Sequence, residues 1–217
     1  MNTCYIFCAG EFDALAVPID EGDLVIAADG GLRHTGHLGI TPDIILGDFD
    51  SLGYVPEGAM VHPVVKDDTD AMLAVRQGLA RGYRDFVIYG GMDGPRLDHT
   101  IANLQTLCFL AEHGARGHLS GLSFTATVIK DEKMVFSPDC TGIFSVFCLG
   151  KDALVSISGA KYEADHALLT AGFPLGVSNH FEGTAVEITA HRGTVILICD
   201  RCNPFPKPLN IQKEESP

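Results

Sequence analysis

The first part of this sequence alternates short apolar runs with helix-like segments, and this order constrains the fold more than any other feature. Two segments, 68–80 and 97–112, place apolar side chains at helical spacing. The apolar runs that have the length and composition of buried strands are Cys4–Ala9, Leu24–Ala28, Asp43–Leu46, Val61–Val65 and Phe86–Tyr89. Strands that alternate with helices predict an α/β domain, Rossmann-like, with a mostly parallel sheet and helices on both of its faces.

The pattern changes after Gly114, where short β-branched runs are separated by Gly, Asp or Pro. Such runs are typical of antiparallel strands, so we expect an all-β sandwich. We place the boundary at Ser137 and Pro138, which gives an α/β domain over residues 1–137 and a β-sandwich over 138–217. From about residue 204 the chain is rich in Pro and charge, and we expect a disordered tail there.

Composition excludes several functional classes. The formal net charge is −13, and no basic stripe is present that could neutralise a nucleic-acid backbone. No apolar run approaches the roughly 18 residues of a membrane span, and the seven cysteines lie mostly in apolar runs that suit reduced thiols. We therefore expect a cytoplasmic protein that binds neither nucleic acid nor a membrane.

Aspartates follow the predicted strands, and their position is informative. Asp29 and Gly30 come after one strand, and Asp48 and Asp50 come after another. Ligands of open α/β sheets bind beyond the carboxyl ends of the strands, so these side chains should converge. Two carboxylates about 4 Å apart repel by roughly 4 kcal/mol at an effective dielectric of about 20, unless a cation such as Mg²⁺ lies between them. For any single aspartate, a turn or capping role is an equal alternative.

The segment from Lys66 to Asp70 precedes the first predicted helix. It could act only as a helix N-cap with acidic residues in the first turn. Alternatively, Asp70 completes a set of oxygen ligands for Mg²⁺ with Asp48 and Asp50, and Lys66 reaches a phosphate.

A glycine-rich segment beginning at Gly90 and Gly91 follows a strand and leads into a helix. Backbone N–H groups in this context bind anions. The segment lacks the spacing of a Walker loop or of a dinucleotide fingerprint, so the glycines alone are a weak signal. Arg96 strengthens the prediction because a guanidinium binds phosphate in a bidentate manner, and Asp98 and His99 lie beside it.

Together these motifs resemble the thiamine pyrophosphokinase family. The resemblance covers nearly the whole chain except the tail and rests on the order and spacing of five segments: Asp29-Gly-Gly, Gly47-Asp-Phe-Asp-Ser51, Asp67-Asp-Thr-Asp70, Gly91-x-x-Gly-x-Arg96-Leu-Asp98-His99 and Gly176-Val-Ser178-Asn179. It implies that the N-terminal domain holds ATP and Mg²⁺ and that the active site lies between two subunits of a homodimer.

The resemblance also implies roles for single residues. Metal ligands would be Asp48, Asp50, Asp70 and Asp98, and Asp70, Asp98 and Arg96 would be catalytic. ATP would be held by Asp29, Gly30, Gly90, Gly91, Lys66, Arg96 and His99. Ser178 and Asn179 would hold thiamine, and an aromatic surface for its ring would come from Phe181, Phe173 or Tyr162.

The implied reaction transfers diphosphate from ATP to the hydroxyethyl oxygen of thiamine and releases AMP. Two alternatives remain: a related diphosphokinase that acts on another heterocyclic alcohol, such as a hydroxymethyl pterin, and a non-catalytic sensor of thiamine or nucleotide. A purely structural protein leaves the aspartates at the strand ends unexplained.

Overall fold

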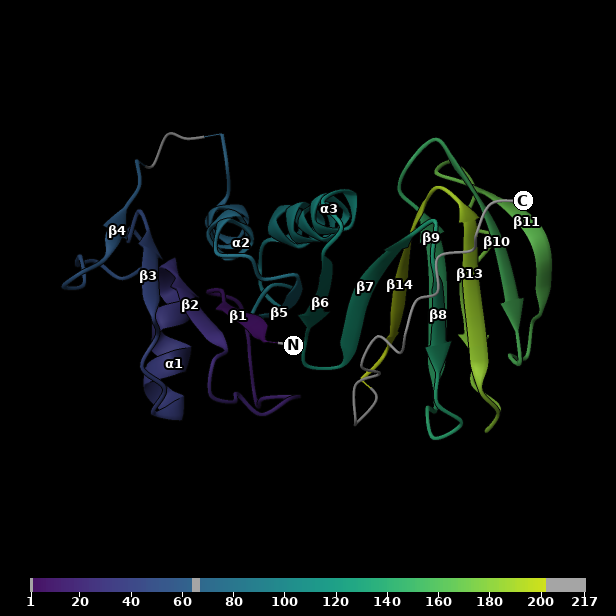
Figure 1. Cartoon of the computed structure of the whole chain (residues 1–217), viewed down its shortest axis with the longest axis horizontal. Coiled ribbons are helices and arrows are strands. Elements are labelled where there is room, and N and C mark those ends of the chain that lie inside the picture. Colours follow the sequence, from purple (N-terminus) through teal and green to yellow (C-terminus); the bar gives the residue numbers. More distant parts are fainter. Residues whose placement is uncertain (1, 64–66, 202–217) are drawn as a thin grey trace. The chain divides into compact units, whose positions relative to one another are not determined.

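The computed structural model describes residues 2–63 and 67–201, and it divides the chain into two compact units, Met1–Leu122 and Ser123–Pro217. The first unit contains a parallel sheet with strand order β6-β5-β1-β2-β3-β4 (Figure 1). Its strands are β1 (Thr3–Phe7), β2 (Leu24–Ala28), β3 (Ile44–Gly47), β4 (Met60–Val61), β5 (Asp85–Tyr89) and β6 (Arg116–Ser120).

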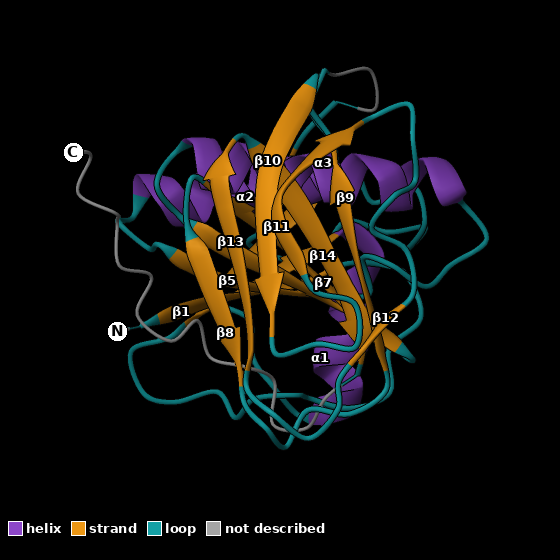
Figure 2. Ribbon diagram, turned by 90° about the vertical axis from the view of Figure 1, so that its right-hand side faces the viewer, coloured by secondary structure: helices purple, strands orange, loops and turns teal. Residues whose placement is uncertain are grey.

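Helices cover both faces of this sheet. α1 (Leu32–Leu38) lies on one face, and α2 (Asp70–Ala80) and α3 (Leu97–Glu112) lie on the other, as Figures 1 and 2 both show. A short 3-10 turn, η1 (Asp29–Gly31), links β2 to α1. α1 ends at Gly39, whose φ of 67° is a left-handed conformation that glycine adopts without steric cost.

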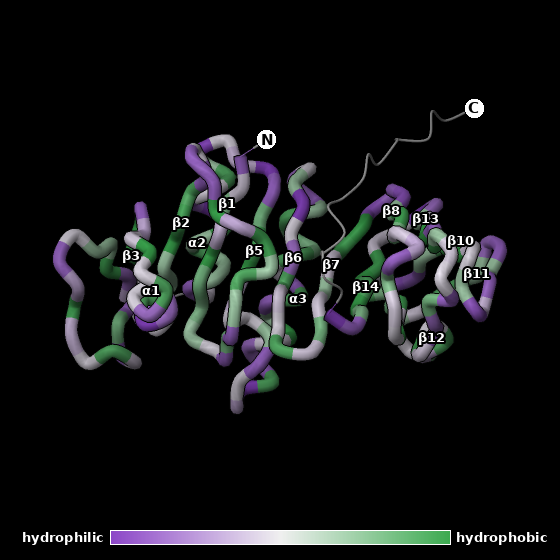
Figure 3. The backbone as a smooth tube through the Cα atoms, turned by 90° about the horizontal axis from the view of Figure 1, so that it is seen from below, coloured by the Kyte–Doolittle hydropathy of each residue, from purple (hydrophilic) through white to green (hydrophobic). Residues whose placement is uncertain are grey.

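The core of the first unit lies around its central strands. β2 is buried at all five positions, and it is coloured hydrophobic along its length in Figure 3. A strand with helices on both of its faces needs apolar side chains in both directions, which is why β2 reads as a continuous apolar run. Tyr5, Phe7 and Tyr89 form a stacked aromatic cluster on one side of the sheet.

The second unit is built from two antiparallel sheets, β12-β9-β14-β7 and β11-β10-β13-β8, which lie one in front of the other in Figure 2. Strict alternation of buried and less buried residues, as in β10, directs one side of each strand into the core. The strands are β7 (Phe124–Lys130), β8 (Lys133–Phe136), β9 (Ile143–Cys148), β10 (Asp152–Ser158), β11 (Ala164–Thr170), β12 (Asn179–His180), β13 (Val186–Arg192) and β14 (Thr194–Asp200).

The structure differs from the sequence prediction at the domain boundary. The prediction placed it at Ser137 and Pro138, whereas the units divide between Leu122 and Ser123. β7 pairs with β14, and β8 pairs with β13, so both strands belong to the second unit. The predicted tail from about residue 204 lies outside the described residues.

The structure also bears on the expected absence of a membrane span and on the expected reduced cysteines. In the described ranges, no helix is long and apolar enough to span a bilayer. Within the same part of the chain, six cysteines are free thiols: Cys4, Cys8, Cys108, Cys140, Cys148 and Cys199.

Candidate active site

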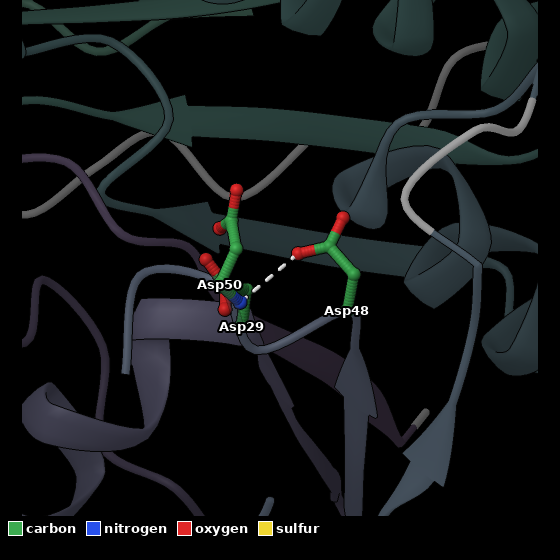
Figure 4. Close-up of side chains that lie close together, drawn as sticks. All are labelled: Asp29, Asp48 and Asp50. Carbon is green, nitrogen blue, oxygen red and sulfur yellow. Dashed lines mark hydrogen bonds between the residues drawn. The ribbon is translucent and has the colours of Figure 1, made fainter. Parts of the chain in front are cut away.

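Three carboxylates meet at the carboxyl ends of β2 and β3. Asp29, Asp48 and Asp50 each offer one carboxylate oxygen, and these three oxygens lie within 4.8 Å of one another (Figure 4). Asp29 is buried, Asp48 is half-buried and Asp50 is exposed, so the cluster opens towards solvent on one side. The backbone N–H of Asp50 donates to Asp48 Oδ1 at 3.3 Å, which fixes the turn between them.

The local backbone explains why these side chains converge. Gly47 has a φ of 148°, and a Cβ atom there would lie 3.1 Å from the backbone of Asp29. Only glycine lets the end of β3 approach the end of β2 this closely. Phe49, which separates the two aspartates, has a φ of 61° and a buried side chain, so the turn directs Asp48 and Asp50 away from the core.

The cluster has the character of a site for a divalent cation. Asp29 Oδ1 is buried and accepts no hydrogen bond in the part of the chain that the structure describes. An unsatisfied buried carboxylate oxygen is costly, and a cation that it coordinates removes that cost. Because all three groups offer oxygen, the residues present fit Mg²⁺ or a similar hard cation.

Asp70 faces the same region from the start of α2. Thr69 caps this helix, because its hydroxyl accepts from the Met72 N–H at 3.2 Å, and Asp68 pairs with Arg76 at 2.9 Å. Asp70 is therefore not needed as the cap. Cys8 and Asp70 line the same cavity; burial raises the pKa of the Cys8 thiol to about 12, and the Asp70 carboxylate adds to this shift. Lys66 lies outside the described residues.

These groups line one cavity of about 520 Å³, which we call the acidic cavity. Its lining residues come mostly from the segments that follow β1, β2, β3 and β5, from the start of α2 with the two residues before it, and from the first two turns of α3. The predicted site residues among them are Asp29, Asp48, Asp50, Asp70, Gly90, Gly91, Arg96 and His99. Gly30 is buried nearby, where a Cβ atom would lie 2.8 Å from the Ala9 side chain.

Asp98 is placed differently from the other predicted metal ligands. It lies outside the Asp29–Asp48–Asp50 cluster, and it pairs with Arg96 at 2.5 Å on the exposed first turn of α3. The hydrogen bond from the Arg96 guanidinium lowers the pKa of the Asp98 carboxyl to about 2. The pair places an ionised carboxylate beside a cation that can bind phosphate.

Two polar residues of α3 reach the acidic cavity and were not predicted. Thr100 Oγ1 donates to the Met92 carbonyl, and Asn103 Nδ2 donates to the Gly91 carbonyl, both at 2.8 Å. Their positions in the sequence could have indicated this role. They lie two and five residues beyond Asp98, and Asn103 places an amide on the same buried helix face as Leu107 and Leu110.

In the second unit, Asn179 is a structural clamp rather than a free polar group. Its Oδ1 accepts from the N–H groups of Tyr162 at 3.0 Å and His180 at 2.8 Å, and its Nδ2 donates to the Tyr162 carbonyl at 2.7 Å. Ser178 is exposed, and its N–H donates to Ser145 Oγ at 3.1 Å.

A second cavity, of about 220 Å³, lies in the second unit, and we call it the apolar cavity. Side chains of β9, β10 and β11 form its walls, including Val146, Val155 and Leu169, and Tyr162 and Asn179 contribute at its edge. Of the aromatic residues considered for a ring-binding surface, Phe181 is only 9% exposed and packs against Phe144, so it belongs to the core. Tyr162 (58% exposed) and Phe173 (64% exposed) remain available.

Family comparisons match most of the chain. Residues 17–116 match the family model of the thiamin pyrophosphokinase catalytic domain, and residues 130–195 match that of the thiamin pyrophosphokinase vitamin B1 binding domain. The first range contains the acidic cluster, and the second contains Asn179. No curated protein sequence matches the chain.

Solved structures share the fold at low identity. Thiamine pyrophosphokinase from Bacillus subtilis is 23% identical, with a TM-score of 0.79, and the match covers 92% of this chain and 99% of that one. Thiamin pyrophosphokinase from Candida albicans is 14% identical, with a TM-score of 0.71 and coverage of 93% and 89%. Yeast thiamin pyrophosphokinase is 16% identical, with a TM-score of 0.69 and coverage of 96% and 87%.

Proposed function

The chain belongs to the thiamin pyrophosphokinase family, and from this we propose that it transfers diphosphate from ATP to the hydroxyethyl oxygen of thiamine and releases AMP. The observation that carries the proposal is the acidic cavity, in which the Asp29–Asp48–Asp50 cluster shares one space with a glycine-rich loop and Arg96. A negative cluster alone would repel ATP, but a carboxylate cluster with a bound cation attracts it.

We propose that Asp29, Asp48, Asp50 and Asp70 hold Mg²⁺, which when bound supplies neutralising charge for the phosphates of ATP. Gly90 and Gly91 allow the backbone to approach the phosphates, and His99 lies on the same wall. Arg96 is 65% exposed beside the cavity, so its guanidinium can turn from Asp98 towards a bound phosphate.

The chemical step requires an alcohol to attack the β-phosphorus of ATP while AMP leaves. Alcohols are weak nucleophiles, and the barrier is lowered mainly by alignment of the two substrates and by stabilisation of charge. Asp70 and Asp98 are the carboxylates that can accept the proton of the hydroxyl. The hydrogen bond from Arg96 lowers the pKa of Asp98 to about 2, so in our proposal Asp98 can act as the base only after Arg96 has turned to the phosphate.

For thiamine, we propose a role for the second unit through Ser178, Asn179 and Tyr162. The Asn179 clamp fixes the backbone of Tyr162, and the exposed ring of Tyr162 offers an apolar surface to an aromatic ligand. Our proposal further includes a homodimer that shares the active site between subunits, and a cytoplasmic location, which suits the six free thiols.

The test of function is a coupled assay on purified protein with ATP, Mg²⁺ and several acceptor alcohols. We expect thiamine diphosphate and AMP in equal amounts, formed only with thiamine and lost when EDTA is present. A hydroxymethyl pterin as the preferred acceptor would identify the rival diphosphokinase. Binding of thiamine and ATP without AMP release would identify a sensor.

The shared site has its own test, which is co-expression of two inactive variants. Asp48→Asn alters the first unit and Asn179→Ala alters the second. If the site is shared, mixed dimers contain one intact site and regain part of the activity. Mixtures that stay as inactive as the single variants would show that each subunit works alone.

A further inference from the structure

In the loop that follows β5, four consecutive carbonyl groups all accept hydrogen bonds from other parts of the protein. The Gly90 carbonyl accepts from the Gly10 N–H at 2.9 Å, and the Asp93 carbonyl accepts from the Glu11 N–H at 2.5 Å. Between them, Gly91 and Met92 have their carbonyls bonded by side chains of α3.

These bonds determine the direction of the peptide units. In a trans peptide, the carbonyl of one residue and the N–H of the next point in opposite directions. Fixing the four carbonyls on protein donors therefore fixes the orientation of the peptide N–H groups of the next four residues, 91–94. All four of these residues line the acidic cavity.

The loop is held from two sides, and the two sides differ in chemistry. On one side, backbone N–H groups of the segment after β1 supply two bonds, and there is no room for a side chain, because a Cβ atom on Gly10 would lie 2.5 Å from the Gly90 oxygen. On the other side, Thr100 and Asn103 supply the two bonds through side chains, so mutation can remove them one at a time.

We infer that Thr100 and Asn103 are positioning residues, which hold the 90–94 loop so that its N–H groups form a preset cradle for the phosphate chain of the nucleotide. This inference rests on the proposed function for the identity of the anion. The two side chains act through the loop and do not themselves take part in the chemistry. Without them the carbonyls would be free to turn towards the cavity, where their negative ends repel phosphate.

Thr100→Val removes the hydroxyl and keeps the shape of the side chain, and Thr100→Ser keeps the hydroxyl. Thr106→Val is the matched control, because Thr106 lies on the same helix, is 1% exposed and donates along the helix to the Ala102 carbonyl at 3.0 Å. Asn103→Leu removes the donor to Gly91 at similar volume and serves as a second variant.

The measurement is calorimetric binding of Mg²⁺-tripolyphosphate, which carries the phosphates without adenine or ribose, together with the KM for ATP and for thiamine. We expect Thr100→Val and Asn103→Leu each to weaken tripolyphosphate binding about tenfold, the effect of one lost hydrogen bond. The KM for ATP should rise in parallel, and the KM for thiamine should stay unchanged. Thr100→Ser should restore binding to within about threefold, and Thr106→Val should behave as wild type.

Wild-type binding in a folded Thr100→Val protein would overturn the inference, and so would an equal loss in Thr106→Val. Thermal unfolding establishes that each variant is folded, and Thr100→Val with its serine rescue decides the question if Asn103→Leu does not fold. The proposed function fails separately: a wild-type protein that makes no thiamine diphosphate, but whose tripolyphosphate binding depends on Thr100, refutes the reaction and supports the cradle.

Discussion

The acidic cavity and the apolar cavity are built in different ways. Loops and helix starts at the ends of parallel strands line the acidic cavity, so its polar groups come from segments that do not pair in the sheet. The walls of the apolar cavity are side chains of the strands themselves, such as Val155 and Leu169, which also form the core of the second unit. Changes in the first cavity should therefore affect chemistry with little effect on folding, whereas changes in the second should affect both.

The largest expected effect is that of Asp29→Asn in the acidic cavity. It replaces one oxygen of the buried carboxylate by an amide NH2 and removes the charge at nearly unchanged volume, and asparagine tolerates the φ of 47° at this position. We expect kcat to fall by roughly 10³-fold or more, since electrostatic groups around phosphates contribute on this scale. Stability in EDTA should rise by on the order of 1 kcal/mol, because repulsion within the cluster decreases.

The control is Glu57→Gln, which removes one exposed carboxylate from the same unit and should change neither quantity. Denaturant unfolding with and without Mg²⁺ measures the stability part. If Asp29→Asn destabilised the protein in EDTA, the carboxylate would be a structural group, and the contrast between the two cavities would lose its basis.

The next effect in size comes from Gly10→Ala, which tests how closely the loops of the acidic cavity fit together. The new methyl group would lie 2.5 Å and 2.6 Å from the carbonyl oxygens of Gly90 and Asp93, so the two loops must separate. We expect a loss of about 10²-fold in kcat/KM for ATP, as misplacement by about 1 Å gives in other enzymes.

Gly36→Ala is the matched control for this substitution. Gly36 lies in α1, and among the described residues no atom beyond its own helical turn lies within 4 Å of the place that a Cβ atom would take. Alanine should therefore stabilise the protein by up to about 1 kcal/mol with unchanged kinetics. Equal activity of the two variants would show that the loop contact has no role in catalysis.

The same contrast explains which features the sequence predicted. β2 and α3 match the predicted ranges because continuous apolar runs and helical spacing are local signals. The convergence of Asp29 with Asp48 and Asp50 followed from the rule for strand ends in parallel sheets, without any knowledge of distances.

The features that the sequence did not predict depend on contacts between distant segments. β11 has only a weak strand signal in the sequence, because it is an edge strand with three exposed positions among its seven, and His166, with a φ of 48°, interrupts its alternation. The domain boundary was placed too late because only pairing with β14 assigns β7 to the second unit. The sequence places Thr100 and Asn103 shortly after Asp98, but only the structure shows the loop carbonyls to which they donate.

A smaller effect is expected from filling the apolar cavity with Ala167→Leu. Ala167 lines this cavity from β11, and three added carbon atoms would occupy part of its 220 Å³. We expect the KM for thiamine to rise about tenfold and the KM for ATP to stay unchanged, with a loss of stability of about 1–3 kcal/mol from overpacking.

The neighbouring Leu168→Ala is the control, because successive side chains of a strand point to opposite faces and Leu168 is 54% exposed. An unchanged KM for thiamine in a folded Ala167→Leu protein would show that the apolar cavity is only a packing feature of the second unit.

The smallest expected effect is on the pH dependence of the stability of the first unit, and it comes from a buried histidine. Burial lowers the pKa of His118, on β6 of the first unit, to about 3, and Arg116 adds to the shift. Between that value and the ordinary histidine pKa of about 6.5, only the unfolded chain binds the proton, so stability falls as the pH falls below about 6.5. The first unit should lose about 1 kcal/mol between pH 6.5 and 5.5 from this histidine.

His118→Gln should remove this part of the pH dependence, and substitution of the exposed His37 by Gln should leave it intact. Hydrogen exchange followed on peptides from β5 and β6, and separately on peptides from β10 and β13, measures the two units in one experiment. If the second unit lost as much protection as the first, the two units would unfold together in a single cooperative transition. The pH dependence would then not distinguish the stability of one unit from that of the other.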